Sequence, residues 1–137
     1  MLDLELRRRC NRAMCAYVAR WGRVPMPIVT CTYRDNEEQG QLWEQGRLKP
    51  GPIVTWAQPG DSPHNQVPSA AFDIAFIRDG VTEWDPVHFS RFAEIAEWYG
   101  IEWGGRWPTP DRPHFQIPGW KPGGTAHAWP AMPEERT

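Results

Sequence analysis

The first hydrophobic pattern of the chain is helical. Between about residue 3 and residue 21, apolar side chains return every three or four positions, the period of a helix with one buried face. This stripe consists of Leu6, Cys10, Ala13, Met14, Tyr17, Val18 and Trp21. Gly22 follows directly and predicts the end of the helix, because glycine readily adopts the backbone conformation that closes one.

Two longer apolar runs predict strands. Residues 27–33 are mostly β-branched or apolar, and residues 70–77 form a second apolar run that ends shortly before Asp79-Gly80. An Asp-Gly pair tolerates the positive φ angles of a tight turn, so the second run and the residues from Val81 onward predict a β-hairpin. Two further short strands are expected at residues 101–103 and 114–117.

Aspartates mark the starts of two more helices. Asp35 is a candidate N-cap, and Glu38 stands three positions later, as in a capping box. The short helix that follows is expected to end near Gly46. Asp85-Pro86 combines an N-cap with proline at the first helical position. The apolar stripe of this last helix, and the glycine that ends it, are Phe89, Phe92, Ile95, Ala96, Tyr99 and Gly100.

The remaining segments lack periodicity. Residues 49–69 are rich in proline and glycine, and loops longer than about 12–15 residues in a compact domain are usually functional or disordered. The chain also loses its pattern beyond Pro118. We therefore expect a single domain over residues 1–119 and a tail over residues 120–137 that either wraps the surface or is disordered. No internal repeat or second domain is evident.

Composition narrows the fold class. The 137 residues include 15 prolines and 12 glycines, which favour a loop-rich α+β protein over a helical bundle, and 9 tryptophans, which supply large apolar surfaces. We expect a small antiparallel sheet with two or three helices on it. The formal net charge of −2 gives no overall basic footprint for nucleic acid. No apolar run is long enough to span a membrane, and a monomer is expected.

Basic residues are nevertheless unevenly distributed. Six arginines fall in or next to the first helix: Arg7, Arg8, Arg9, Arg12, Arg20 and Arg23. They form either an ordinary solvated helix face or a surface that steers the protein to an anionic polymer such as a bacterial cell wall. The three cysteines, Cys10, Cys15 and Cys31, lack the spacing of a disulfide framework. The N-terminus shows no signal peptide pattern.

Two histidines and two aspartates carry the candidate chemistry. Asp73 interrupts an apolar strand, and a buried carboxylate needs a partner or a metal to offset its desolvation. His64 and His114 would complete a set of two imidazoles and one carboxylate, which suits a catalytic zinc ion with one open position. Asp111 precedes His114 by three residues, where a general base would be needed.

The other two histidines are poorer candidates. His88 lies early in the last predicted helix, on its expected exposed side, and His127 lies in the tail. Neither is assigned to the metal.

The motifs together resemble a known family. They are Thr32-Tyr33-Arg34, Ser62-x-His64, Ala71-x-Asp73, Trp103-Gly104-Gly105-x-Trp107 and Asp111-x-x-His114. Their order over about residues 27–117 resembles that of the LAS zinc peptidases, which include phage L-alanyl-D-glutamate endopeptidases and bacterial D-alanyl-D-alanine carboxypeptidases and dipeptidases. The short length and the W-G-G-x-W element look most like the phage endolysins.

The resemblance implies a fold and a set of roles. The fold would be the LAS or hedgehog-like one, with a single Zn²⁺ per chain bound at the sheet by His64, Asp73 and His114. Asp111 would be the general base, and Arg34 would stabilise the developing oxyanion. Residues with a substrate-binding or, alternatively, a structural role are Ser62, Tyr33, Trp103 and Trp107. Gly104-Gly105 predicts a turn or a close backbone approach.

The implied function is hydrolysis of an amide in the peptidoglycan stem peptide. The leading expectation is an L-alanyl-D-glutamate endopeptidase that acts as a phage endolysin, made in the host cytoplasm and released to the wall by a holin. A D-Ala-D-Ala carboxypeptidase or dipeptidase is one alternative, a virion-associated enzyme another, and a non-catalytic zinc-stabilised binding module of the same fold a third. Asp111 and Arg34 argue against the last, since a structural site needs neither.

The sequence departs from the family pattern at one point. The usual spacing places the aspartate seven positions after the first histidine, whereas Asp73 stands nine after His64, and Val67-Pro68-Ser69 replaces a stretch that usually contains glycine. Two extra loop residues cost little, because the entropy of loop closure grows slowly with length. The ligand geometry survives if the insertion bulges away from the metal.

Overall fold

The computed structural model describes residues 1–124 and 128–134. An antiparallel sheet with the strand order β1-β2-β5-β4 forms its centre, and β3 pairs with the end of β2. Its strands are β1 (Met26–Cys31), β2 (Ala71–Arg78), β3 (Val81–Glu83), β4 (Glu102–Trp103) and β5 (His114–Gln116). The helices are α1 (Leu4–Trp21), α2 (Asn36–Glu44) and α3 (Pro86–Trp98). The α+β class predicted from the sequence is confirmed.

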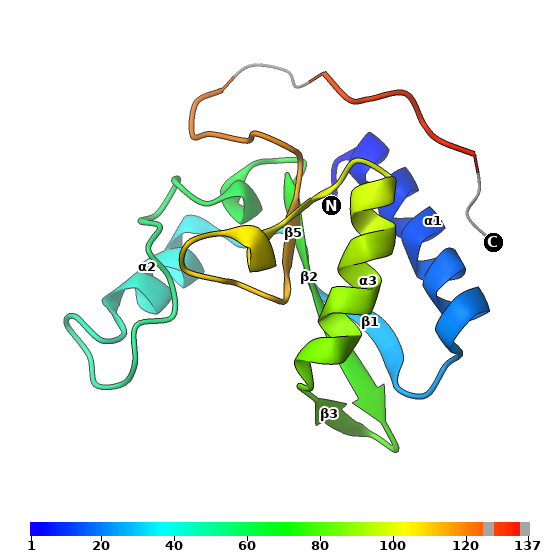
Figure 1. The fold of residues 1–137 in the computed structure, drawn as a ribbon. Helices are drawn as coiled ribbons and strands as arrows, with labels where there is room; N and C mark the ends of the chain where they lie inside the picture. Colours follow the sequence, from blue (N-terminus) through cyan, green and yellow to red (C-terminus); the bar gives the residue numbers. More distant parts are fainter. Residues whose placement is uncertain (125–127, 135–137) are drawn as a thin grey trace.

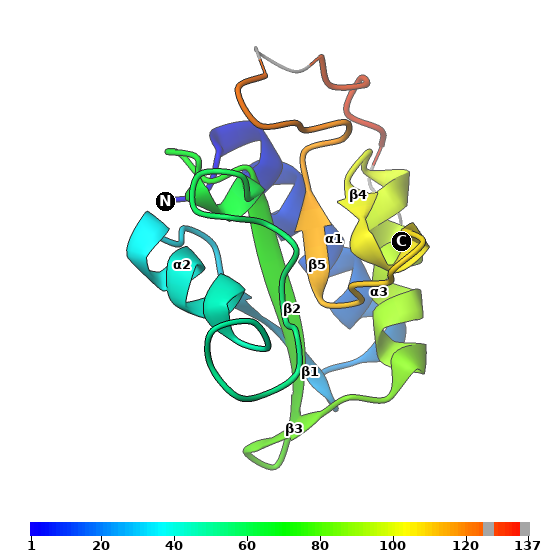
Figure 2. The same cartoon turned by 90° about the vertical axis from the view of Figure 1, so that its left-hand side faces the viewer.

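The helices divide between the two faces of the sheet. Helices α1 and α3 lie side by side on one face (Figure 1). Helix α2 and the long loop that follows it lie on the other face (Figure 2). The layers α1/α3, sheet, and α2 with its loop therefore leave the second face of the sheet only partly covered, and the candidate site lies there.

Strand β2 supplies both the core and the site because successive side chains point to opposite faces. Phe72, Ile74 and Phe76 are fully buried against α1 and α3. Asp73 lies between two of them and therefore points to the opposite face, toward α2. The burial of its neighbours fixes this orientation, since a shift of one residue would expose the phenylalanines.

The predicted helix starts are observed. The carboxylates of Asp3, Asp35 and Asp85 accept hydrogen bonds from the backbone N–H groups of the first turns, at 3.0, 2.8 and 3.0 Å. The hairpin turn also forms as expected, with φ angles of 50° at Asp79 and 75° at Gly80. The first strand is shorter than predicted and ends at Cys31, after an irregularity in its register with β2. Two 3₁₀ helices, Pro63–Asn65 and Gly104–Arg106, have no counterpart in the sequence-based prediction.

The extra residues between His64 and Asp73 bulge away from the sheet. Val67 at the tip is 74% exposed. Ser69 is buried and pairs with the N-terminal segment, where its N–H donates to Met1 O at 2.7 Å and its carbonyl accepts from Asp3 N at 2.9 Å. The longer spacing is therefore absorbed by contacts with the N-terminus, and Asp73 keeps its place in β2.

Arg9 differs from the other arginines of the first helix. It is only 2% exposed, its Nε donates to Glu5 Oε1 at 2.9 Å, and its Nη1 donates to Tyr99 O at 2.8 Å. Its Nη2 donates to Pro130 O, and its guanidinium lies 4.7 Å from the centre of the Trp129 ring. Arg9 therefore cannot belong to an exposed steering surface, because it joins α1, α3 and the C-terminal segment.

Part of the predicted tail packs on the helices. Trp120, Trp129 and Met132 contact the main core, and residues 128–134, in red, run over the top right of the molecule in Figure 1. His127 lies outside the described residues. His88 is not on an open helix face: its side chain is 11% exposed, with Nε2 2.9 Å from Glu83 Oε2. Among the described residues, no helix is long and apolar enough to cross a membrane.

Candidate active site

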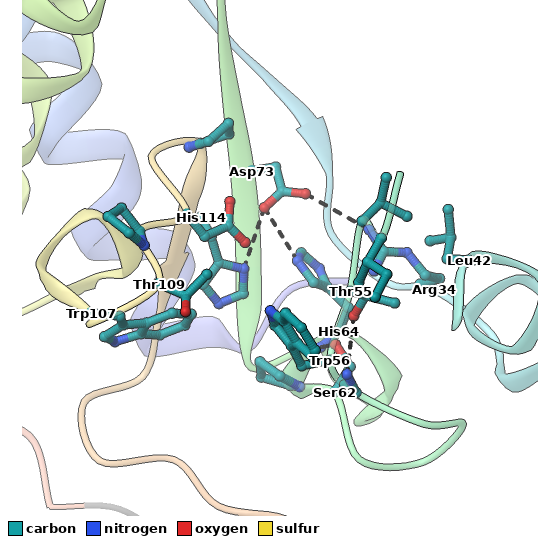
Figure 3. A pocket seen from close by; sticks show the side chains of 17 residues that line it. Arg34, Leu42, Thr55, Trp56, Ser62, His64, Asp73, Trp107, Thr109 and His114 are labelled. Carbon is teal, nitrogen blue, oxygen red and sulfur yellow. Dashed lines mark hydrogen bonds and ion pairs between the residues drawn. The ribbon is translucent and has the colours of Figure 1, made fainter. Parts of the chain in front are cut away.

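The three predicted metal ligands meet on the open face of the sheet. Asp73 Oδ1 lies 3.3 Å from His64 Nε2 and 3.4 Å from His114 Nδ1. Figure 3 shows both imidazoles pointing toward this carboxylate. Two nitrogens and one carboxylate thus converge from segments that are far apart in sequence.

Local structure explains this convergence. Asp73 and His114 are direct partners in the antiparallel pairing of β2 with β5, so they share one face of the sheet. His64 sits in the 3₁₀ helix Pro63–Asn65, which begins at Ser62, whose hydroxyl accepts from His64 N at 3.2 Å. Asn65 Oδ1 accepts in return from Ser62 N at 3.2 Å, which completes a capping box.

Each imidazole is oriented by a hydrogen bond on the side away from Asp73. His64 Nδ1 lies 2.7 Å from Thr32 O, and His114 Nε2 lies 2.8 Å from Gln116 Oε1. Both partners are acceptors, so each of these nitrogens carries a hydrogen. His64 Nε2 and His114 Nδ1 consequently present lone pairs toward Asp73 when the rings are neutral, which is the arrangement that metal-binding histidines use.

The charged forms of Asp73 and His64 stabilise each other, which changes the pKa of both groups. Burial alone would lower the pKa of His64, but hydrogen bonds to Asp73, Cys31 and Thr32 O and the charge of Asp73 outweigh it and raise that pKa to about 9. Burial opposes ionisation of Asp73, yet its bonds to His114 and His64 and their charges hold the pKa of this carboxyl well below its usual range. Asp73 is therefore ionised at neutral pH.

The donor set fits a zinc ion. One carboxylate oxygen and two imidazole nitrogens are the ligands that catalytic zinc sites use, and each imidazole has the outer hydrogen-bond partner typical of such sites. In the metal-free protein, the negative charge of the Asp73 carboxylate is balanced by a proton on the His64 imidazole. A divalent cation would replace that proton as the partner of the carboxylate.

Cys31 offers an alternative to His114. Cys31, His64 and Asp73 carry possible ligand atoms within 4.8 Å of one another. The Cys31 thiol, however, lies 3.7 Å from His64 Nδ1, the nitrogen that is bound to Thr32 O. A metal held by His64 Nε2 and Asp73 therefore faces His114, and we favour the set that contains two histidines.

Asp111 stands on the same side of the sheet, at a rigid turn. Its N–H donates to Gly104 O at 2.9 Å, and its carbonyl accepts from His114 N at 3.3 Å. A side chain at Gly104 would come within 2.6 Å of Asp111 O, so the glycine permits the close approach that its motif predicted. Partial burial of the carboxyl raises the pKa of Asp111; the charge of Asp73 acts in the same sense, while that of His114 opposes it.

Arg34 reaches the site from the segment after β1. Its Nη2 lies 3.8 Å from Asp73 Oδ2, and its Nη1 donates to Gln39 Oε1 at 3.0 Å. Its Nε is buried and has no hydrogen-bond partner within the described structure. Gln39 is fully buried, and its amide also donates to Thr55 Oγ1 at 3.2 Å and Ala57 O at 2.7 Å. Gln39 therefore connects Arg34 with the long loop.

The ligand set lies in an open cleft of about 520 Å³. The first wall is formed by Trp107, Thr109, Pro110, Asp111 and Pro113, and the second wall is the loop segment 53–57. The Trp107 ring on the first wall lies 5.2 Å from the His114 ring. Trp56 on the second wall is 70% exposed. Figure 3 shows Trp107 beside His114 and Trp56 below the two imidazoles.

The other predicted site residues are placed differently. Ser62 lines the cleft, but its hydroxyl caps the turn before His64. Trp103 is 6% exposed in the core, and its indole N–H donates to Arg112 O at 2.8 Å, so it supports the first wall from behind. Tyr33 is 44% exposed and is not among the residues that line the cleft. Of the two roles considered for Trp103, substrate binding and structural support, its position in the core favours structural support.

Four residues of the site were not predicted from the sequence: Gln39, Trp56, Glu102 and Gln116. Gln39 and Glu102 act through hydrogen bonds that include partners at least 14 residues away in sequence, and no local pattern marks them. Gln116 lies two residues after His114 on the same face of a strand, and this spacing could have marked it. Trp56 carried one usable signal, because it lies in the middle of the long loop that was expected to be functional.

Comparisons with known proteins found similarity to peptidases in sequence. A peptidase M15 family model, described as D-alanyl-D-alanine carboxypeptidase, matches residues 55–117. The peptidoglycan L-alanyl-D-glutamate endopeptidase CwlK of Bacillus subtilis (strain 168) is 37% identical over 101 residues, which is 66% of this chain. The chain spans 59% of the length of that relative.

A solved structure has a similar fold. The L-Ala D-Glu endopeptidase ChiX of Serratia marcescens matches with a TM-score of 0.62 and 22% identity, over 85% of this chain and 80% of that one. On fold and sequence together, the predicted resemblance to LAS-type peptidases is confirmed. The closer similarity to phage endolysins stays a prediction.

Proposed function

We propose that this chain is a zinc-dependent peptidoglycan peptidase that cleaves the L-alanyl-D-glutamate bond of the stem peptide. The observation that carries the proposal is the convergence of His64 Nε2, Asp73 Oδ1 and His114 Nδ1 in an open cleft that Asp111 and Arg34 also line. The similarity to CwlK, an endopeptidase by its name, supports the choice of bond.

The shape of the cleft favours an endopeptidase over a dipeptidase. The rim residues Val54, Trp56 and Pro110 are exposed, so the ligands lie along an open groove. Such a groove admits a peptide that continues on both sides of the cleaved bond, whereas a free dipeptide is bound best in a closed pocket. The cross-linked wall is therefore the better substrate.

The residues of the chain divide the chemical work. A zinc ion bound by the triad would supply a Lewis acid that lowers the pKa of a water molecule from 15.7 toward about 7. The Asp111 carboxylate takes a proton from the attacking water and delivers it to the nitrogen of the leaving amine. The Arg34 guanidinium faces the carbonyl oxygen of the cleaved amide, where negative charge develops.

The binding-module alternative explains less of the site. A structural zinc site tends to have four protein ligands. It has no use for a carboxylate such as that of Asp111 in the cleft beside the ligands, or for a guanidinium such as that of Arg34, 3.8 Å from Asp73. Both features are expected of a site that performs acid–base chemistry on a bound amide.

The direct test is a digest of purified peptidoglycan by the zinc-loaded protein, analysed by mass spectrometry. We expect new L-Ala carboxyl ends paired with free D-Glu amines, loss of this product with EDTA, and its return when zinc is added. Asp111→Asn serves as the matched control, because it keeps the metal ligands but removes the base.

Two other results would change the assignment. Release of D-Ala would make the protein a carboxypeptidase, in line with the description of the matching family model. Absence of any EDTA-sensitive product from several wall types would favour the binding module. The role as a phage endolysin released by a holin remains a proposal from the motifs, which lysis by the protein expressed with and without a holin would test.

A further inference from the structure

A chain of polar side chains runs from His114 to the far edge of the sheet. Gln116 is two residues after His114 on the same face of β5 and is 5% exposed. Its Oε1 lies 2.8 Å from His114 Nε2, and its Nε2 donates to Glu102 Oε2 at 3.0 Å. Glu102 is the direct partner of Gln116 in the pairing of β4 with β5.

The order of donors and acceptors in this chain is forced. An ionised carboxylate only accepts hydrogen bonds, so Glu102 requires the NH₂ group of Gln116 to face it. The carbonyl oxygen of the same amide must then face His114. That oxygen can only accept, so His114 carries its hydrogen on Nε2 and presents Nδ1 toward Asp73.

Glu102 also holds parts of the cleft and the end of β5. Its Oε2 accepts from the indole Nε1 of Trp107 at 3.2 Å, and its Oε1 accepts from Gly119 N at 2.9 Å. The same carboxylate therefore supports the orientation of one ligand and the position of the aromatic ring beside it.

The two imidazoles differ in how they are oriented. His64 donates to a main-chain carbonyl, that of Thr32, which no substitution removes. His114 depends on two side chains, Gln116 and Glu102. Side-chain substitutions can therefore change the orientation of His114, but they cannot remove the hydrogen bond that orients His64.

We propose that Glu102 and Gln116 are positioning residues that hold His114 in the Nε2–H tautomer and thereby set the metal affinity of the site, and that Glu102 fixes Trp107 at the same time. Outer hydrogen-bond partners of metal ligands typically change metal affinity by about 10–100-fold when they are removed.

The test measures zinc affinity and tautomer in the full chain. Zinc affinity is obtained by competition with a chromophoric chelator, and the tautomer of His114 by ¹⁵N NMR of the imidazoles in the metal-free protein at a pH where they are neutral. Gln116→Leu should lower zinc affinity about 10–100-fold and mix the two tautomers. Glu102→Ala should give a smaller loss of zinc affinity, because Gln116 remains but its amide is no longer oriented by a carboxylate.

Two further variants separate positioning from general damage. The exchange Glu102→Gln with Gln116→Glu keeps one carboxylate and one amide and restores an acceptor for His114, so its affinity should return to within a few-fold of wild type. Glu97→Ala removes a carboxylate that pairs with the exposed Arg106 at 3.0 Å, away from the cleft, and should leave zinc affinity unchanged.

The outcomes are distinguishable. Wild-type zinc affinity and an unchanged tautomer in Gln116→Leu would overturn the proposal. If that variant fails to fold, the exchange variant decides: zinc affinity as low as that of Glu102→Ala would equally overturn it. Neither readout needs peptidase activity, so an inactive but zinc-binding protein would refute the proposed function and leave this inference standing.

One consequence does rest on the proposed function. Because Glu102 also holds Trp107, Glu102→Ala in zinc-saturated protein should raise KM for the wall peptide, whereas Gln116→Leu under the same conditions should not.

Discussion

The two walls of the cleft are built in different ways. The wall that carries Asp111 and His114 is tied to the sheet by main-chain hydrogen bonds, from Asp111 N to Gly104 O at 2.9 Å and from Ile74 N to Pro113 O at 2.9 Å. The opposite wall, segment 53–57, is held by side chains of α2 and its following turn: Gln39 binds Thr55 and Ala57, and Arg47 Nη2 donates to Thr55 O at 3.1 Å.

The two kinds of support suit different tasks: catalysis on the first wall and substrate recognition on the second. A general base must stay within hydrogen-bond reach of the proton that it transfers, and a main-chain scaffold secures that. A wall held by two side chains tolerates changes of the residues that face the substrate. We therefore expect substitutions of Asp111 or His114 on the first wall to affect turnover, and substitutions on the second wall to affect binding or the position of Arg34.

The largest effect should follow loss of a ligand. His114→Ala should abolish both zinc binding and turnover, whereas Cys31→Ser should leave both close to wild type, because the thiol faces the nitrogen of His64 that is bound to Thr32 O. Zinc content by atomic absorption and the peptidoglycan digest measure the two properties. If Cys31→Ser lost zinc and turnover while His114→Ala kept both, the third ligand would be Cys31 at the end of β1 and not His114.

The next effect concerns the base. Asp111→Ala should lower turnover by about 10²–10⁴-fold while zinc remains bound, since a positioned general base typically contributes that much. Single-turnover digestion of a labelled stem peptide, together with zinc content, measures both. Turnover equal to wild type would remove Asp111 from the mechanism.

A smaller loss is expected from the anchor of the second wall. Gln39→Leu removes the bonds to Arg34, Thr55 and Ala57, and a displaced catalytic group can cost up to about 10²-fold in kcat/KM. Gln41→Leu, on the exposed side of the same helix, is the matched control. If both variants kept full activity with unchanged thermal stability, the second wall would not depend on side-chain anchors.

Trp56 should act on binding alone. Trp56→Ala removes an exposed indole from the rim and should raise KM about 3–10-fold with little change in kcat, since contacts of an aromatic ring contribute roughly 0.5–1.5 kcal/mol. Trp84→Ala removes another exposed indole, one outside the cleft lining, and should change neither constant. An equal fall of kcat in Trp56→Ala would place this wall in the chemical step.

The smallest expected effect is the release of a proton when zinc binds. The pKa of His64, raised to about 9, means that this residue is protonated in the metal-free protein at pH 7, so zinc binding should release about one proton there and progressively fewer as the pH rises through 9. Titration calorimetry in buffers of different ionisation enthalpy measures the release. His88→Gln should not alter it, and a release that is independent of pH would contradict the raised pKa.

Most elements could be predicted because their signals are local. The stripe that begins at Leu6, the caps at Asp35 and Asp85 and the Asp79-Gly80 turn each act within a few residues, and the structure contains the corresponding helices and hairpin. The 3₁₀ helix at His64 escaped prediction because so short an element carries no periodicity. The exposure expected for Arg9 and His88 was wrong, because their partners Tyr99, Pro130 and Glu83 come from other elements.

The sequence by itself determined which residues are candidates for the chemistry: His64, Asp73, Asp111 and His114 stand out by type and spacing. Only the tertiary structure decided how they are oriented. Thr32 meets His64 through the path of a loop, and Glu102 meets Gln116, the neighbour of His114 on β5, through the register of β4 with β5. Trp103 and Trp107, four residues apart, end in the core and in the cleft. A hydrogen bond depends on where two backbones meet in space, and no local pattern of side chains encodes that.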